Sequence, residues 1–182
     1  IRAQLRDVAR LLRDPNVGVR RAAVKGAAER VLCQSWELLP SDEASKLVGL
    51  VVETCFDGAA ASVRVDSLRG VGVLLGNYLA HPVVARSLPT LAPLVHDPCE
   101  RVRVELLDVL LKVQCVRDFV FTDVVPLERL LYLLVTDTRA VAKKVAELLC
   151  GTYFPFRKGS KSVLKRALAL YDENPKAALQ FY

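Results

Sequence analysis

Hydrophobic and polar residues recur along this chain with the period of an amphipathic helix. In residues 1–14 the apolar side chains fall on one face and the arginines on the other. Valine-rich pieces such as residues 46–52 are short, and they fit a buried helix face as well as a strand. The pattern predicts an all-α protein, with helices at roughly 16–34, 41–56, 60–79, 83–95, 99–114, 138–151 and 160–172.

A second pattern repeats over a longer distance. In the stretch LVHDPCERVRVELLDVLLKV (94–113), the apolar run stops at Asp97 and restarts with Val102 and Arg103. Three other turns share this order of residues: Asp14/Val19/Arg20, Asp57/Val63/Arg64 and Asp137/Ala142/Lys143. The four aspartates lie 43, 40 and 40 residues apart, a period typical of helical solenoids. We therefore expect an α-solenoid of paired antiparallel helices, with about four repeats and the start of a fifth (roughly 1–34, 41–79, 83–114, 124–151 and 160–182).

The aspartate and the basic residue of each repeat have a predicted structural role. An aspartate in the turn can accept hydrogen bonds from the free N–H groups that open the following helix. The basic residue six positions later can reach the aspartate of its own repeat or of the neighbouring one. These pairs would form an Asp–Arg ladder of Asp14, Arg20, Asp57, Arg64, Asp97, Arg103, Asp137 and Lys143. Exposed pairs contribute only about 0–1 kcal/mol each, so such a ladder would set the register of the repeats more than their stability.

This order of residues resembles the HEAT repeat. Asp14 with Arg20, and Asp97 with Arg103, match the HEAT pattern fully. The third match has alanine in place of valine before Lys143, and in the second repeat the arginine comes one residue late. A proline eight residues before the aspartate is also usual in HEAT repeats, and Pro89 fits that place.

Composition narrows the class of protein. The chain has 182 residues, of which 52% are hydrophobic, so it can bury a core and is not a disordered tail. It begins and ends within helical patterns, which we interpret as a piece of a longer protein. The longest uncharged run, residues 70–85, is too short to span a membrane. The five cysteines are widely spaced, which favours buried reduced thiols over disulfides or a metal site.

The sequence contains little that indicates catalysis. Both histidines, His81 and His96, lie beside turn residues and have no nucleophile at a suitable spacing. The glycines of residues 70–76 do not match a dinucleotide-binding motif, and RKGSKS lacks the Gly-Lys-Ser order of a phosphate-binding loop. We expect a non-enzymatic protein without a cofactor, metal or small-molecule substrate.

Charge is unevenly distributed along the chain. The net charge is +6 overall, with +5 in residues 1–30, −5 in 31–138 and +6 in 139–182. Basic clusters at the two ends could contact a phosphate backbone, and aromatic residues do not alternate with the basic ones as they do in single-strand binders. Solvated helix faces or a site for an acidic protein explain the same clusters. The DNA-binding candidates are Lys144, Arg157, Lys158, Lys161, Lys165, Arg166, Arg6 and Arg13. Lys144 is chosen over its neighbour Lys143 because Lys143 is expected to pair within the ladder.

A closer resemblance covers nearly the whole chain. The pieces SWELLP (35–40), NYLAHP with the residues that follow it (77–121), and AALQFY (177–182) resemble the G-type HEAT-repeat subunits of condensin II. The resemblance implies a non-catalytic scaffold acting in mitotic chromosome condensation, in the nucleus and on chromosomes. It implies kleisin and SMC subunits as partners, with ATP hydrolysis by the SMC subunits, and possible contact with double-stranded DNA. The alternatives are a HEAT-repeat adaptor of the transport or phosphatase-scaffold type, and a segment that only spaces binding surfaces.

Overall fold

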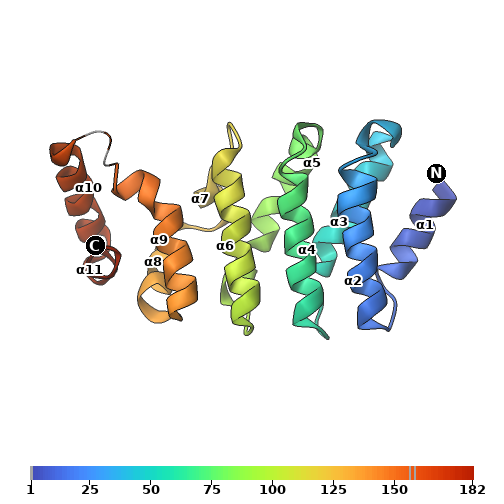
Figure 1. The fold of residues 1–182 in the computed structure, drawn as a ribbon, viewed down its shortest axis with the longest axis horizontal. Helices are drawn as coiled ribbons and strands as arrows, with labels where there is room; N and C mark the ends of the chain where they lie inside the picture. The colour runs from blue at the N-terminus through green and yellow to red at the C-terminus, as the bar shows by residue number, and fades with distance from the viewer. Residues whose placement is uncertain (1, 156, 158) are drawn as a thin grey trace.

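The computed structural model describes residues 2–155, 157 and 159–182, and this part of the chain contains helices and no strand. The helices form two rows (Figure 1). The first row contains α1 (Arg2–Leu11), α3 (Ser41–Thr54), α5 (His81–Ser87) with its continuation η4 (Leu88–His96), and α8 (Leu127–Thr136). The second row contains α2 (Val17–Lys25) with its continuation η1 (Gly26–Leu32), α4 (Ala61–Leu74), α6 (Glu100–Cys115) and α9 (Arg139–Tyr153). Short helices η2 (Trp36–Leu38), η3 (Tyr78–Ala80) and α7 (Phe121–Val124) lie in the connections.

Apolar side chains fill the space between the two rows. Leu68, Leu106 and Leu148 are fully buried, and they belong to one continuous cluster that extends from Leu12 to Ala178. Along the second row, α2 packs on α4, α4 on α6, and α6 on α9. Each repeat therefore buries its apolar face against its neighbour, which is how an α-solenoid is stabilised.

Prolines interrupt the first helix of the third repeat. The α-helix α5 ends at Ser87, and residues Leu88–His96 continue as a 3-10 helix. Pro89 and Pro93 lie in this segment, and a proline can neither donate the next helical hydrogen bond nor accommodate the carbonyl four residues earlier. The HEAT-like proline at position 89 thus marks a real change of helix type.

A close helix contact explains one glycine of the 70–76 group. Helix α4 packs against the π-helix η1, and a Cβ atom on Gly70 would lie 2.9 Å from the Cβ of Ala28. Real Cβ atoms do not approach so closely. Glycine at position 70 therefore allows α4 and η1 to pack at their observed distance.

The last two helices do not continue the regular arrangement. Helix α10 (Ser160–Glu173) packs against α9 of the second row, whereas α11 (Pro175–Phe181) packs against α8 of the first row. In the earlier pairs, the helix that comes first in the chain lies in the first row. The segment at 160–182, which the sequence predicts as the start of a fifth repeat, is therefore a helical hairpin with its two rows exchanged.

The cysteines are less buried than their sequence positions suggest. All five are free thiols, but only Cys55 is buried. Cys115 and Cys150 lie on exposed faces near the C-terminal ends of α6 and α9, which corrects the expectation of buried thiols. Burial raises the pKa of the Cys55 thiol well above its usual value.

Candidate functional site

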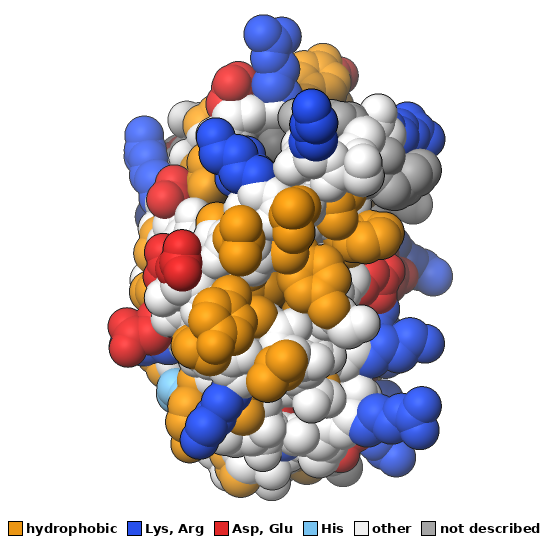
Figure 2. Space-filling model, turned by 90° about the vertical axis from the view of Figure 1, so that its left-hand side faces the viewer, with side chains coloured by type: hydrophobic (Ala, Val, Ile, Leu, Met, Phe, Trp, Pro, Cys, Tyr) orange, Lys and Arg blue, Asp and Glu red, His pale blue; other side chains and the backbone are white. Residues whose placement is uncertain are grey.

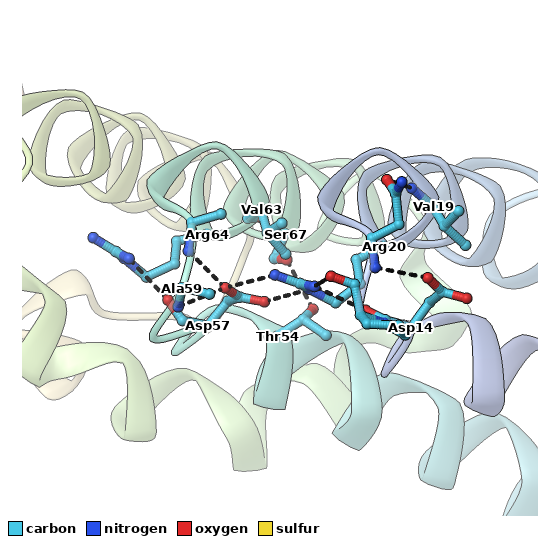
Figure 3. Close-up of polar contacts among 12 residues, drawn as sticks. Asp14, Val19, Arg20, Thr54, Asp57, Ala59, Val63, Arg64 and Ser67 are labelled. Carbon is cyan, nitrogen blue, oxygen red and sulfur yellow. Dashed lines mark hydrogen bonds and ion pairs between the residues drawn. The ribbon is translucent and has the colours of Figure 1, made fainter.

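Three arginines of the second row each bind an aspartate of the next repeat. Arg20 donates to Asp57 at 2.6 and 3.2 Å, and Figure 3 shows this pair. Arg64 donates to Asp97 at 2.8 Å through both Nε and Nη2, and Arg103 donates twice to Asp137 at 2.7 Å. The extra residue of the second repeat lies in the turn before α4 and does not displace Arg64. Each contact is bidentate, the geometry in which guanidinium binds carboxylate best.

Each of these arginines also binds the turn of its own repeat. The Nη1 atoms of Arg20, Arg64 and Arg103 donate to the backbone carbonyls of the preceding ladder aspartates, at 2.8, 2.8 and 2.6 Å. The aspartate carboxylates also accept backbone N–H groups, as Asp57 does from Ala59 and Ala60 at 3.0 and 2.8 Å. One arginine thus connects two successive turns. This arrangement fixes the position of each repeat relative to the next.

The ladder is more buried than its sequence positions suggest. The Arg20 and Asp57 side chains are 9% and 10% exposed, and those of Arg103 and Asp137 are 15% and 8% exposed. The sequence alone predicts exposed pairs, each of which contributes little to stability. Because water is largely excluded, removing one partner of such a pair costs more than removing one partner of a surface pair.

Lys143 does not form the fourth pair of the ladder. Its side chain is exposed, and no carboxylate among the described residues binds it. The next inter-helix turn carries Asn174 in place of an aspartate, and its side-chain oxygen accepts from the N–H of Ala177 at 3.0 Å to cap α11. The ladder therefore ends at Asp137.

Helices α1 and α10, in or near which most of the candidate DNA-binding residues lie, are at opposite ends of the array (Figure 1). Arg13, two residues after the end of α1, donates to Glu53 at 2.9 and 3.2 Å. Arg6 of α1 lines a pocket together with Glu43 and Lys46 of α3. Contrary to the sequence expectation, Lys144 is not free: it binds Asp108 at 2.8 Å and Glu147 at 3.3 Å.

The C-terminal candidates are more accessible than Lys144. Lys161, Lys165 and Arg166 of α10 are exposed, without an acidic partner among the described residues. Arg157 is exposed as well, and Lys158 lies outside the described residues. On the surface of α10, Lys161 and Lys165 share one face, and Arg166 lies on a different face.

Comparison with known proteins identifies the relatives of this array. No protein-family model matches the chain. The chain is 33% identical over 186 residues to the condensin-2 complex subunit G2 of Xenopus laevis, and that alignment covers all of this chain and 16% of the relative. The subunit G2 of Homo sapiens is 32% identical with the same coverages, and that of Danio rerio is 35% identical over 94% of the chain and 15% of the relative. The chain belongs to the condensin-2 subunit G2 family.

The G2-family chain thus spans about a sixth of the length of these curated relatives. Solved structures resemble it in fold. A designed armadillo repeat protein, solved with a (KR)4 peptide, matches with a TM-score of 0.61 over 96% of this chain and 80% of its own, at 17% identity. An engineered protein from a structural-genomics programme matches with a TM-score of 0.56 over 98% and 76% of the two chains, at 15% identity. These matches support the α-solenoid architecture.

Sequence reasoning missed a second set of charge pairs, on the second-row helices of this G2-family segment. Asp66, whose side chain is 1% exposed, accepts from Arg21 at 2.6 Å and lies within 4 Å of Lys25 and Arg69. Arg69 then reaches Glu105 on α6 at 2.9 Å. Except for Lys25, these residues line a groove of about 880 Å³ that runs beside α4 and α6. The sequence signal for these pairs is that residues of opposite charge lie about one repeat apart. The turn pattern predicts only the pairs of the Asp–Arg ladder.

Among the described residues, no cluster of His, Cys, Asp and Glu has the arrangement of a metal site. In the same part of the chain, every helix is too short or too polar to cross a bilayer.

The ladder predicts how stability depends on pH. Burial alone would raise the pKa of Asp57 and Asp137, but hydrogen bonds from Arg20 and Arg103 and from backbone N–H groups hold each pKa below its usual value. Such a carboxyl contributes stability that is complete above its unfolded pKa, about 3.9, and is lost as the pH falls through the folded value. We expect urea denaturation to show constant stability from about pH 7 to 5, and a decrease below about pH 4.

Two comparisons make this prediction specific to the ladder. Arg103→Ala removes the interaction that lowers the pKa of Asp137, so its stability should depend less on pH below about pH 4. Burial raises the pKa of Glu105, because the ionised carboxylate loses contact with water. Protonation of Glu105 should therefore stabilise the protein, whereas protonation of Asp57 or Asp137 should destabilise it. A loss of stability that begins near pH 6 would contradict the prediction, because it would lie well above the range in which these aspartates titrate.

Proposed function

We propose that this chain is a non-catalytic scaffold segment of condensin II that acts in mitotic chromosome condensation, in the nucleus and on chromosomes. The observation that carries the proposal is the match to subunit G2 over 94–100% of the chain, at 31–35% identity in four species. The ladder supports a scaffold role because it fixes each repeat against the next. A fixed array can hold partner-binding surfaces at constant separations.

The proposed partners are the kleisin and SMC subunits of condensin II. In this proposal ATP hydrolysis belongs to the SMC subunits, and the HEAT-repeat array supplies surface and spacing. The alternative is a HEAT-repeat adaptor for another protein, without a role on DNA. The two alternatives differ in what the basic ends of the array bind.

For DNA, we propose that the C-terminal basic end of the array contacts the phosphate backbone of a duplex. Lys161, Lys165 and Arg166 support this because they are exposed and lack an acidic partner among the described residues. Lys144 and Arg13 should contribute less, since carboxylates already bind both of them. Contacts of this kind are independent of base sequence and weaken as salt increases.

Fluorescence anisotropy of a labelled duplex, titrated with the protein at several salt concentrations, tests the DNA proposal. Affinity should fall log-linearly with salt, by a slope of about 0.9 for each phosphate contact. The triple variant Lys161→Gln, Lys165→Gln, Arg166→Gln should lose most of the binding and reduce that slope by about 2–3.

The matched control changes the same amount of charge elsewhere. Arg86, Arg101 and Arg129 are exposed and lie in the acidic middle of the chain, so the triple glutamine variant at these positions should retain binding. Equal losses in the two triple variants would show that only net charge matters. The absence of binding at low salt would contradict the DNA proposal for this segment and would favour the protein-binding alternative.

A further inference from the structure

Helix α10 has an exposed apolar stripe. Leu164, Leu168 and Tyr171 are 62%, 56% and 51% exposed. They are four and three residues apart, so they lie on one face of the helix. Figure 2 shows hydrophobic side chains gathered in the middle of this end of the molecule, with charged side chains of both signs around the edge. Exposed apolar patches with a polar border mark interaction sites.

Two cations lie along one edge of this stripe. Lys161 is three residues before Leu164, and Lys165 is three residues before Leu168, so both lysines border the leucines. Both are exposed without an acidic partner in the described part of the chain. Asp172 lies on the same edge near the end of the helix and is also exposed.

Within the array, cations in comparable positions do have partners. Arg21 on α2 binds Asp66 on α4, and Arg69 on α4 binds Glu105 on α6. At each of these helix–helix contacts, apolar packing is accompanied by a cation on one helix and a carboxylate on the next. The outer face of α10 has the apolar stripe and the cations, and no helix among the described residues supplies carboxylates to them.

The hairpin of α10 and α11 also departs from the regular stacking. The rows are exchanged in this hairpin, Lys143 has no ladder partner among the described residues, and Asn174 replaces the ladder aspartate. The ladder contacts that place one repeat on the next therefore do not continue into this hairpin. A helix that covers α10 would be held by the apolar stripe and the lysine edge, without the ladder.

We propose that the outer face of α10 docks an amphipathic helix of a partner protein, with an apolar stripe and acidic side chains along one edge. The apolar stripe of the partner would pack on Leu164, Leu168 and Tyr171, as two amphipathic helices pack through their apolar faces. Glutamates or aspartates four residues apart on its edge would pair with Lys161 and Lys165. The proposal depends on the α10 face alone and holds whether or not the basic end binds DNA.

The test uses two labelled helical peptides of about 20 residues. Both have the same leucine stripe, and one carries glutamates along the edge where the other carries lysines. Anisotropy titrations should show the acidic peptide binding the protein at least about tenfold more tightly than the basic one. The double variant Lys161→Glu, Lys165→Glu should reverse that preference. Equal affinities for the two peptides, or binding of neither, would overturn the proposal.

A second pair of variants separates this site from the DNA proposal. The variant Leu164→Ser, Leu168→Ser should abolish binding of the acidic peptide and leave duplex binding unchanged, because the leucines carry no charge. Both leucines are exposed, so the melting temperature should also remain unchanged. Leu38→Ser, at a leucine that is 72% exposed elsewhere on the surface, is the matched control and should bind the peptide normally.

Light scattering identifies a competing occupant. If the protein forms dimers that the Leu164→Ser, Leu168→Ser variant converts to monomers, a second copy of the chain covers this face and the proposal is wrong. If the protein remains monomeric and the acidic peptide binds with one-to-one stoichiometry, the proposal is supported. Because Lys161 and Lys165 would serve both ligands, bound acidic peptide should also lower the affinity for duplex DNA wherever DNA binding is observed.

Discussion

Arg103→Ala should lower the free energy of unfolding by about 2–4 kcal/mol. The arginine donates twice to Asp137 at 2.7 Å and once to the carbonyl of Asp97 at 2.6 Å. Its removal leaves the Asp137 carboxylate, which is 8% exposed, without its guanidinium partner. A carboxylate that is both buried and unpaired is costly. The loss should therefore exceed the contribution of about 0–1 kcal/mol typical of a surface pair.

Urea denaturation of the Arg103→Ala and Arg10→Ala proteins measures this effect. Arg10 is exposed on α1 and has no charge partner among the described residues, so its replacement should change stability by less than about 0.5 kcal/mol. A double-mutant cycle with Asp137→Ala should give a coupling energy of about 1–3 kcal/mol. Equal stabilities of Arg103→Ala and Arg10→Ala would show that the ladder does not hold the repeats together.

Gly70→Ala should destabilise the protein by about 1–3 kcal/mol, although alanine is the better helix former. The new Cβ would lie 2.9 Å from the Cβ of Ala28, and it would also meet Val51 at 3.7 Å. The Cβ of Ala28 moves only with its backbone, so α4 and η1 must separate to make room. The overlap should therefore outweigh the gain in helix propensity.

Two other glycines provide controls with the same substitution. A Cβ on Gly49 of α3 meets nothing within 4 Å, so Gly49→Ala should stabilise the protein by about 0.5–1 kcal/mol. A Cβ on Gly72 meets the flexible end of Lys112, which can move, so Gly72→Ala should have a small effect. Thermal or urea unfolding of the three variants compares them directly. Stabilisation by Gly70→Ala would contradict the proposed reason for glycine at this position.

The repeat architecture follows from local patterns in the sequence. Apolar residues at helical spacing determine which segments form helices, and aspartates about 40 residues apart mark the turns between helix pairs. Both signals involve residues that are close together within one repeat, so the same helices and turn can be recognised in each repeat. The resemblance to condensin II subunits also rests on residues read in order along the chain, and the identity to subunit G2 agrees with it.

The partners of individual charged residues do not follow from the sequence. Lys143 and Lys144 are neighbours in the chain, yet Lys144 binds Asp108 and Lys143 remains exposed. The direction in which each helix faces its neighbour decides between them. The same reason explains Asp66, which is buried against Arg21 although 45 residues separate the two.

By itself, the sequence determined an all-α solenoid, the positions of its turns and the residue types that could pair across them, because helix periodicity and turn chemistry act over a few residues. The tertiary structure decided which carboxylate each arginine binds, how deeply the ladder is buried, and that α10 and α11 exchange rows and leave an apolar face uncovered. These features depend on how helices far apart in the chain are placed against one another. Burial and charge pairing between such helices are properties of the packed array, and no single repeat contains them.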